Sequence, residues 1–226
     1  MTLPPFFRST RDSLHALACY AIAPARKART GRIGLRPTGD GFGTPPFDDG
    51  SRTVVRGDRL QLEPGHSIAI TTVRAAAEYL QVPLLADPGV GSDLPPYEPD
   101  APLDVDAESS LALGSWYWTG QQALDALGLR VGDKAAAISE AQLWPEHFDL
   151  AVTADLANGR KVNIGFSAGD GFEPDPYVYV GPHDMTGVEG DYWNAPFGAY
   201  KRYVSLDPDD QAGSALAFIE TGIASL

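Results

Sequence analysis

The sequence contains a single cysteine, Cys19. An intrachain disulfide needs two cysteines, and a zinc site built from thiolates also needs more than one. The cysteine content therefore excludes both an intrachain disulfide and a zinc site built from thiolates.

Long apolar runs are also missing. No stretch approaches the roughly 18 consecutive apolar residues of a membrane-spanning helix, and the N-terminus lacks the basic-then-apolar pattern of a signal peptide. We therefore expect a soluble, cytoplasmic protein with no membrane partner.

Basic residues are scarce. Seventeen Lys and Arg face thirty Asp and Glu, which gives a formal net charge of -13 and a pI near 4.5. Such an excess of negative charge opposes binding to phosphate backbones, so we expect no nucleic-acid partner.

The basic residues are unevenly distributed. Residues 1–74 carry a net charge of +5 and residues 75–226 a net charge of -18. The favoured interpretation is that the two parts pack with complementary fields. One alternative is that the segment from Arg26 to Arg36, which holds five basic residues, binds an anionic ligand. A role at a membrane surface is the other alternative.

The chain has enough apolar residues to fold around a sizeable core. It is 226 residues long, with 43% hydrophobic and 10% aromatic residues. This length fits one large domain or two small ones.

The first 82 residues predict a helix, an antiparallel meander and a second helix. Ser9 followed by Asp12 resembles a capping box, and the helix should end near Pro24. Residues 31–71 alternate β-type runs with Gly-Asp and Pro-Gly turns, and residues 72–82 return to helical spacing.

Residues 83–106 are rich in proline and acidic residues and predict a connector. Asp106 then begins a long helix that Gly128 should close, and antiparallel strands follow from about Ala135 to Leu206. Asn158-Gly159 is typical of a type I′ hairpin turn. A last helix follows the acidic residues 207–210.

These elements predict an α+β fold with antiparallel sheet layers and three to four packing helices. Three segments are expected: an N-terminal half at residues 1–82, the connector at 83–106, and a C-terminal half at 107–226, with packing as a single domain as the alternative. Both halves share the order helix, strands, helix, which suggests a structural duplication.

Three segments of this chain resemble an uncharacterised bacterial protein family that is known only as a domain of unknown function. They are the early DSLHALACYAIAPARKA helix, LWPEHFDLAV at residues 143–152, and NIGFSAGDGFEPDPYVYVGP at residues 163–182. The resemblance implies a common fold. It supplies no activity, so no catalytic residue is assigned from it.

The segment Gly165-Phe166-Ser167-Ala168-Gly169 matches the pattern of a hydrolase nucleophile elbow. An elbow requires a helix directly after the serine, but the next residues are rich in glycine and proline. A strand followed by a glycine-rich loop is the better interpretation, and a hydrolase using Ser167 and His183 stays as an alternative.

A metal site is a further alternative. Imidazole and carboxylate groups suit several metal ions, and alternation along a strand would place His147 and Asp149 on one face. The set contains Glu146, His147, Asp149, His183 and Asp184. Because its spacing matches no tight metal motif, we predict neither a metal nor another cofactor.

Aromatic residues concentrate between residues 144 and 197. Most should be core residues, while the rest could line an apolar site in which a few polar groups orient a ligand. The candidate ligand-binding residues are Trp144, His147, Asp149, Ser167, Asp170 and Tyr179. Trp118 is offset from the core face of its helix, and its exposure would suggest an interface.

We therefore expect a non-enzymatic protein that binds a small molecule or a protein partner. The alternatives are a hydrolase, metal-assisted or serine-dependent, that uses residues 144–184, and a structural protein that forms homo-oligomers.

Overall fold

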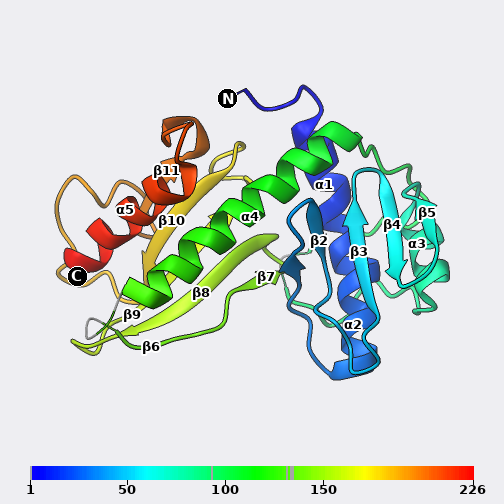
Figure 1. The fold of residues 1–226 in the computed structure, drawn as a ribbon, viewed down its shortest axis with the longest axis horizontal. Helices are drawn as coiled ribbons and strands as arrows, with labels where there is room; N and C mark the ends of the chain where they lie inside the picture. Colours follow the sequence, from blue (N-terminus) through cyan, green and yellow to red (C-terminus); the bar gives the residue numbers. More distant parts are fainter. Residues whose placement is uncertain (1, 93, 131, 133–134) are drawn as a thin grey trace. The chain divides into compact units, whose positions relative to one another are not determined.

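The computed structural model describes residues 2–92, 94–130, 132 and 135–226. It confirms an α+β fold with two antiparallel sheets and packing helices (Figure 1). None of the helices in these residues is long and apolar enough to cross a membrane.

The chain forms two compact units, and each takes residues from more than one stretch of sequence. The N-terminal unit comprises Leu3–Trp118 and Leu143–Phe148. The C-terminal unit comprises Met1–Thr2, Thr119–Gln142 and Asp149–Leu226. These bounds differ from those of the three predicted segments, and residues 83–106 belong to the N-terminal unit.

The first helix continues past Pro24, contrary to the prediction. Helix α1 (Phe7–Leu17), the π-helical turn η1 (Ala18–Ile22) and helix α2 (Ala23–Thr30) follow one another without a break. A proline inside an α-helix lacks the N–H donor and crowds the carbonyl four residues earlier. Here the wider π turn precedes Pro24, which occupies the first turn of α2, where no N–H bond is needed.

The predicted capping box is also wrong. The helix begins at Phe7, two residues before Ser9. The Ser9 hydroxyl donates to the Phe6 carbonyl at 3.2 Å, so it does not cap a free N–H group.

The first sheet is a meander of five strands, as predicted, in the order β1-β2-β3-β4-β5. Its strands are β1 (Arg36–Pro37), β2 (Gly41–Gly43), β3 (Arg52–Arg56), β4 (Arg59–Glu63) and β5 (Ser67–Ala69). Helix α3 (Val73–Leu80) follows, and its cap residue Thr72 accepts the Ala75 N–H at 3.0 Å.

The connector at residues 83–106 packs onto the helical core of its own unit. Its described residues form no helix or strand. Even so, Val90 is fully buried in a cluster with Cys19 and Tyr20, and the Leu103 N–H donates to the Thr71 carbonyl at 2.8 Å. The segment is an ordered part of the N-terminal unit.

Helix α4 (Ala107–Arg130) begins where predicted and ends two residues later than predicted. Asp106 caps it by accepting the Ser109 N–H at 2.8 Å. Gly128 does not end the helix because its backbone keeps a negative φ, and a helical glycine costs only about 1 kcal/mol.

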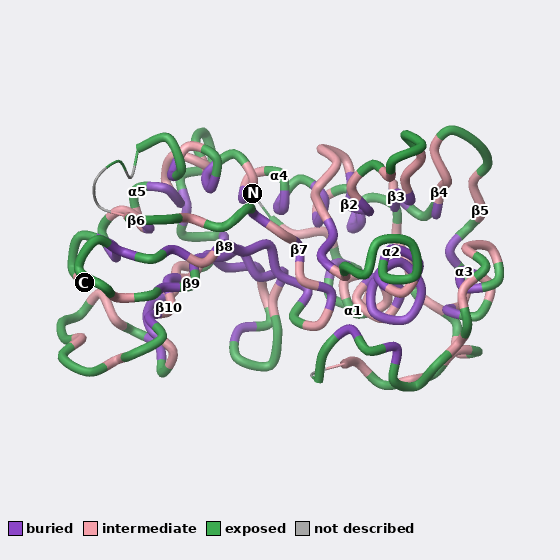
Figure 2. Tube along the Cα trace, turned by 90° about the horizontal axis from the view of Figure 1, so that it is seen from below, coloured by how far each residue is buried: buried purple, intermediate pink, exposed green. Residues whose placement is uncertain are grey.

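The second sheet runs in the order β11-β10-β9-β8-β6, with all pairs antiparallel. Its strands are β6 (Ala135–Ile138), β8 (Asp149–Leu156), β9 (Lys161–Ser167), β10 (Tyr177–Pro182) and β11 (Ala199–Arg202), and β7 (Gln142–Trp144) also pairs with β8. Most of β8 and β9 is buried (Figure 2).

The hairpin between β8 and β9 forms at Asn158-Gly159, but its turn type differs from the prediction. A type I′ turn needs a positive φ at both central residues, and only Gly159 has one, at 84°. The Gly159 N–H donates to the Leu156 carbonyl and the Leu156 N–H to the Arg160 carbonyl. These bonds define a three-residue loop that ends on a left-handed glycine.

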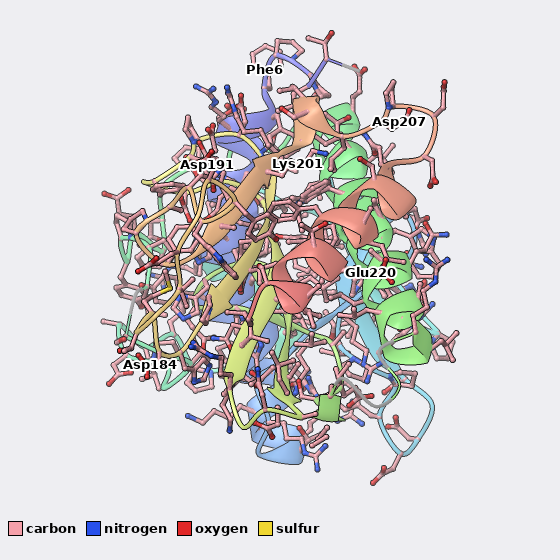
Figure 3. The ribbon with its side chains drawn as sticks, turned by 90° about the vertical axis from the view of Figure 1, so that its left-hand side faces the viewer. Phe6, Asp184, Asp191, Lys201, Asp207 and Glu220 are labelled. Carbon is pink, nitrogen blue, oxygen red and sulfur yellow. The ribbon has the colours of Figure 1, made fainter. Side chains whose placement is uncertain are left out.

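Helices cover one face of the second sheet. Gly120 of α4 lies so close to Phe166 that an added Cβ would stand 2.7 Å from the ring. Helix α5 (Gln211–Ala224), capped by Asp210, lies along β10 with Leu216 and Ile219 buried (Figure 3). Each half of the chain thus has the predicted order of helix, strands and helix.

Candidate functional site

The second sheet has two chemically different faces. On the face with α5 and the second half of α4, the strands present apolar residues such as Leu150, Ile164 and Val178. The opposite face carries Asp149, Ser167 and Tyr177, which occupy directly paired positions on β8, β9 and β10. Paired residues project from the same face, so the register alone brings these three polar side chains into one row.

Tyr179 joins this row by crossing β9. Its hydroxyl donates to Asp149 Oδ2 at 2.5 Å, although β9 separates their two strands. The residue paired with Tyr179 on β9 is Gly165, and a Cβ there would stand 2.6 Å from the phenol ring. The missing side chain of Gly165 is therefore what lets Tyr179 reach Asp149.

Tyr177 makes the matching contact with the loop after β9. Its hydroxyl donates to Asp170 Oδ2 at 2.6 Å. The other oxygen of Asp170 accepts the N–H groups of Phe172 and Glu173 at 2.8 and 3.1 Å. One carboxylate thus fixes both the loop and the ring of Tyr177.

Aromatic rings surround this pair of tyrosines. Tyr200 on β11 lies 5.8 Å from Tyr177 between ring centroids, and Phe197 lies 6.2 Å from Tyr179. Phe172 is 5.0 Å from both Tyr200 and Phe197, and it is 44% exposed. We call Asp149, Ser167, Asp170, Tyr177 and Tyr179 the Tyr–Asp cluster.

Both tyrosines of the cluster stay protonated. Burial is the main cause that raises the pKa of Tyr179, and the carboxylate of Asp149 adds to it. Burial and then the hydrogen bond to Asp170 raise the pKa of Tyr177 in the same way. Near neutral pH these phenols are hydrogen-bond donors, with pKa values too high for efficient general acid or base catalysis.

An ion-pair group borders the cluster. Arg202 Nε lies 3.0 Å from Glu173 Oε2, and its Nη2 lies 3.5 Å from Asp175. Because Arg202 is the residue paired with Tyr177 on β11, the row of polar residues extends to the edge strand.

The geometry of a nucleophile elbow is absent from the described residues around Ser167. The serine ends β9, and residues 168–176 form a loop with no helix. Ser167 Oγ accepts the Gly169 N–H at 3.1 Å. His183 Nε2 contacts Asn163 Oδ1 at 2.9 Å, four residues from Ser167 along β9, which corresponds to about 13 Å.

The structure contradicts the expected alternation of His147 and Asp149. Residues 145–148 form a turn in which Phe148 has a φ of 51°, and β8 begins only at Asp149. Strand alternation therefore does not apply, and His147 is exposed whereas Asp149 is buried. Trp144 and His147 belong to the N-terminal unit, while Asp149, Ser167, Asp170 and Tyr179 belong to the C-terminal unit.

No group of three or more His, Cys, Asp or Glu side chains that could hold a metal ion occurs in the residues described. Cys19 is buried, and its thiol donates to the Pro145 carbonyl at 3.0 Å. Burial raises the pKa of that thiol, so Cys19 is a poor nucleophile.

Sequence reasoning placed four cluster members in the candidate set and missed Tyr177 as a site residue. The missed signal is the spacing of Tyr177 and Tyr179, which puts two phenols on one face of a strand. Arg202 gave no local signal, because its position beside Tyr177 depends on strand pairing.

No protein family model, no curated protein and no solved structure matches this chain. The resemblance to an uncharacterised bacterial family stays a prediction.

Proposed function

We propose that the protein is a non-enzymatic binding protein that holds a small cationic molecule on the Tyr–Asp cluster of its C-terminal unit. The observation that carries this proposal is the pairing of two carboxylates with two tyrosine hydroxyls on one sheet face. The bonds Tyr179 to Asp149 and Tyr177 to Asp170 fix both rings and both carboxylates in place.

The chemistry of the cluster favours a positive charge. Carboxylates attract a cation directly, and the faces of aromatic rings attract it through their quadrupoles. Rings of Phe172, Phe197 and Tyr200 lie within 5.0 to 6.2 Å of one another or of the two cluster tyrosines.

The charge of the C-terminal unit supports the same ligand class. This unit has fifteen acidic and six basic residues, a net charge of -9. Several of its carboxylates, among them Asp184, Asp191 and Asp207, lie on the outside of the molecule (Figure 3). The resulting field attracts cations toward the unit.

The protonated tyrosines favour binding over catalysis. A general acid or base works best with a pKa near the working pH, whereas burial moves both phenols away from it. The separation of Ser167 from His183 along β9 also disfavours the serine hydrolase alternative.

A cytoplasmic location and the absence of a nucleic-acid partner are parts of this proposal. The lone Cys19 and the net charge of -13 support them. A homo-oligomer stays an alternative, with Trp118, which is 43% exposed, as a candidate contact.

The proposal is tested by titrating the protein with choline, putrescine and L-arginine, using glycerol as an uncharged control. Calorimetry should show saturable binding of at least one cation, and D149N and Y179F should each weaken it about tenfold or more, because each removes a directly contacting group.

Two matched variants separate binding from stability. Asp155 lies on the same strand as Asp149, with an ion pair to Lys161, and D155N should keep wild-type affinity. The Tyr192 hydroxyl donates to the Phe218 carbonyl in the same unit, so Y192F loses a comparable bond away from the cluster. Equal losses in D149N and D155N, or no binding of any cation, would contradict the proposal.

A further inference from the structure

Arg26 of helix α2 is the only lysine or arginine that is buried among the described residues. It is 8% exposed. Its Nη1 atom is enclosed and has no hydrogen-bond partner among the described residues. A guanidinium keeps its charge at any accessible pH, so an enclosed and unpartnered one is costly.

The other basic residues of α2 have partners, which makes Arg26 the exception. Lys27 Nζ donates to the Gly89 carbonyl at 2.7 Å. Arg29 pairs with Asp49 at 2.8 Å and lies over the Phe47 ring at 3.7 Å. The sequence around α2 can therefore satisfy basic side chains, but leaves the Nη1 atom of Arg26 without such a contact among the described residues.

Two further arginines lie near Arg26. Burial is the main cause that lowers the pKa of Arg26, and the charges of Arg32 and Arg36 add to it. Arg32 is exposed, and Arg36 is half-buried on β1. All three belong to the N-terminal unit.

We propose that Arg26, with the exposed Arg32 near it, forms a binding site for the phosphate group of a small anionic ligand. A guanidinium presents several N–H donors in a planar fork that matches the oxygens of a phosphate. Such an anion would offset the charge of the buried Arg26 guanidinium, whose Nη1 atom has no hydrogen-bond partner among the described residues. This site lies in a different unit from the Tyr–Asp cluster and takes a ligand of the opposite charge, so it stands independently of the proposed function.

The site is tested with inorganic phosphate, by calorimetry and by the midpoint of thermal unfolding at constant ionic strength kept with sodium chloride. Wild type should bind phosphate saturably and unfold at a higher temperature in its presence. R26M keeps much of the side-chain volume but removes the charge, and it should lose both effects. Phosphate that stabilises wild type and R26M equally would overturn the proposal, because the effect would then be general.

Two more variants keep the test valid if R26M is poorly folded. R32Q changes an exposed side chain, so it should fold normally and weaken phosphate binding about threefold, as expected for a partly screened charge. Arg59 is exposed in the same unit and donates to the Ser67 carbonyl at 3.0 Å, so R59Q is the matched control and should bind as wild type does. If R59Q weakens phosphate binding as much as R32Q does, the proposal is also overturned.

Two probes identify the source of the phosphate. Phenyl phosphate that binds at least as well as inorganic phosphate supports a phosphorylated small molecule as the ligand. Weaker binding of phenyl phosphate supports free phosphate instead. If acetate raises the unfolding temperature as much as either phosphate compound, the assignment to phosphate is contradicted, since one carboxylate would then suffice.

Discussion

The two units treat a buried charge differently. In the C-terminal unit Asp149 is 7% exposed, and its Oδ2 atom accepts the Tyr179 hydroxyl at 2.5 Å, while its Oδ1 atom is enclosed without a hydrogen bond among the described residues. In the N-terminal unit Arg26 is 8% exposed and its enclosed Nη1 has no partner among the described residues. Partnered burial is the ordinary condition of charged groups in folded proteins, and an enclosed donor without a partner costs free energy. The Asp149 carboxylate is therefore expected to stabilise its unit through the bond to Tyr179, and the Arg26 guanidinium to lower the stability of its own unit.

The largest effect should come from Gly165, on which the Asp149 side of this comparison depends. An added side chain would stand 2.6 Å from the Tyr179 ring, so G165V must displace the ring and break its bond to Asp149. We expect a loss of about 3 kcal/mol in the free energy of unfolding, measured with urea.

Gly171 provides the control for G165V. It lies in the loop after β9, where no atom would stand within 4 Å of an added Cβ, and G171A should change stability by less than about 0.5 kcal/mol. A G165V protein as stable as wild type would show that the crossing of Tyr179 over β9 contributes little.

The next effect should come from the hydroxyl alone. Y179F leaves the ring in place but removes the donor to the buried Asp149, which should cost about 2 kcal/mol. Y192F, which removes a hydroxyl bond to a backbone carbonyl, should cost about 1 kcal/mol. Urea unfolding of both variants compares the two losses, and an equal loss would mean that the charge of Asp149 adds nothing.

Alkaline pH should weaken the C-terminal unit. The folded protein holds the protons of Tyr177 and Tyr179 above their ordinary pKa of 10.0, so unfolding releases them once the pH exceeds that value. Stability from this source is complete below about pH 10 and falls as the pH rises, by up to about 1.4 kcal/mol per unit for each tyrosine.

This pH effect is measured as the slope of the unfolding free energy between pH 9.5 and 11. Y179F should lower the slope by about one proton's contribution, because phenylalanine does not titrate. An unchanged slope in Y179F would rule out a raised pKa at this position.

The smallest effect compares a paired with an unpaired arginine. R202M removes the cation that lies 3.0 Å from the buried Glu173, so it should cost about 1 kcal/mol. R26M removes a buried charge whose Nη1 atom has no hydrogen-bond partner in the described part of the chain, so without phosphate it should leave stability unchanged or raise it by up to about 1 kcal/mol. Thermal unfolding in chloride buffer tests both, and a larger loss in R26M than in R202M would reverse the comparison.

Much of the fold followed from local patterns. Asp106 and the acidic residues 207–210 marked helix starts correctly, because capping needs only a side chain two or three residues from the free N–H groups. The helix end predicted near Pro24 was wrong, because the π turn before Pro24 depends on how the whole helix packs. The prediction that His147 and Asp149 share one face of a strand was wrong, because a turn with a left-handed Phe148 interrupts the alternation.

The sequence by itself determined the α+β class, the meander and most element positions, since these depend on periodicity, caps and turn residues close together in the chain. It also marked Asp149, Ser167, Asp170 and Tyr179 as candidates. Only the tertiary structure decided that Tyr179 crosses Gly165 to reach Asp149, and that the Arg26 Nη1 atom is enclosed without a hydrogen-bond partner among the residues described. Strand register and burial arise from contacts between residues distant in sequence, and no local pattern encodes them.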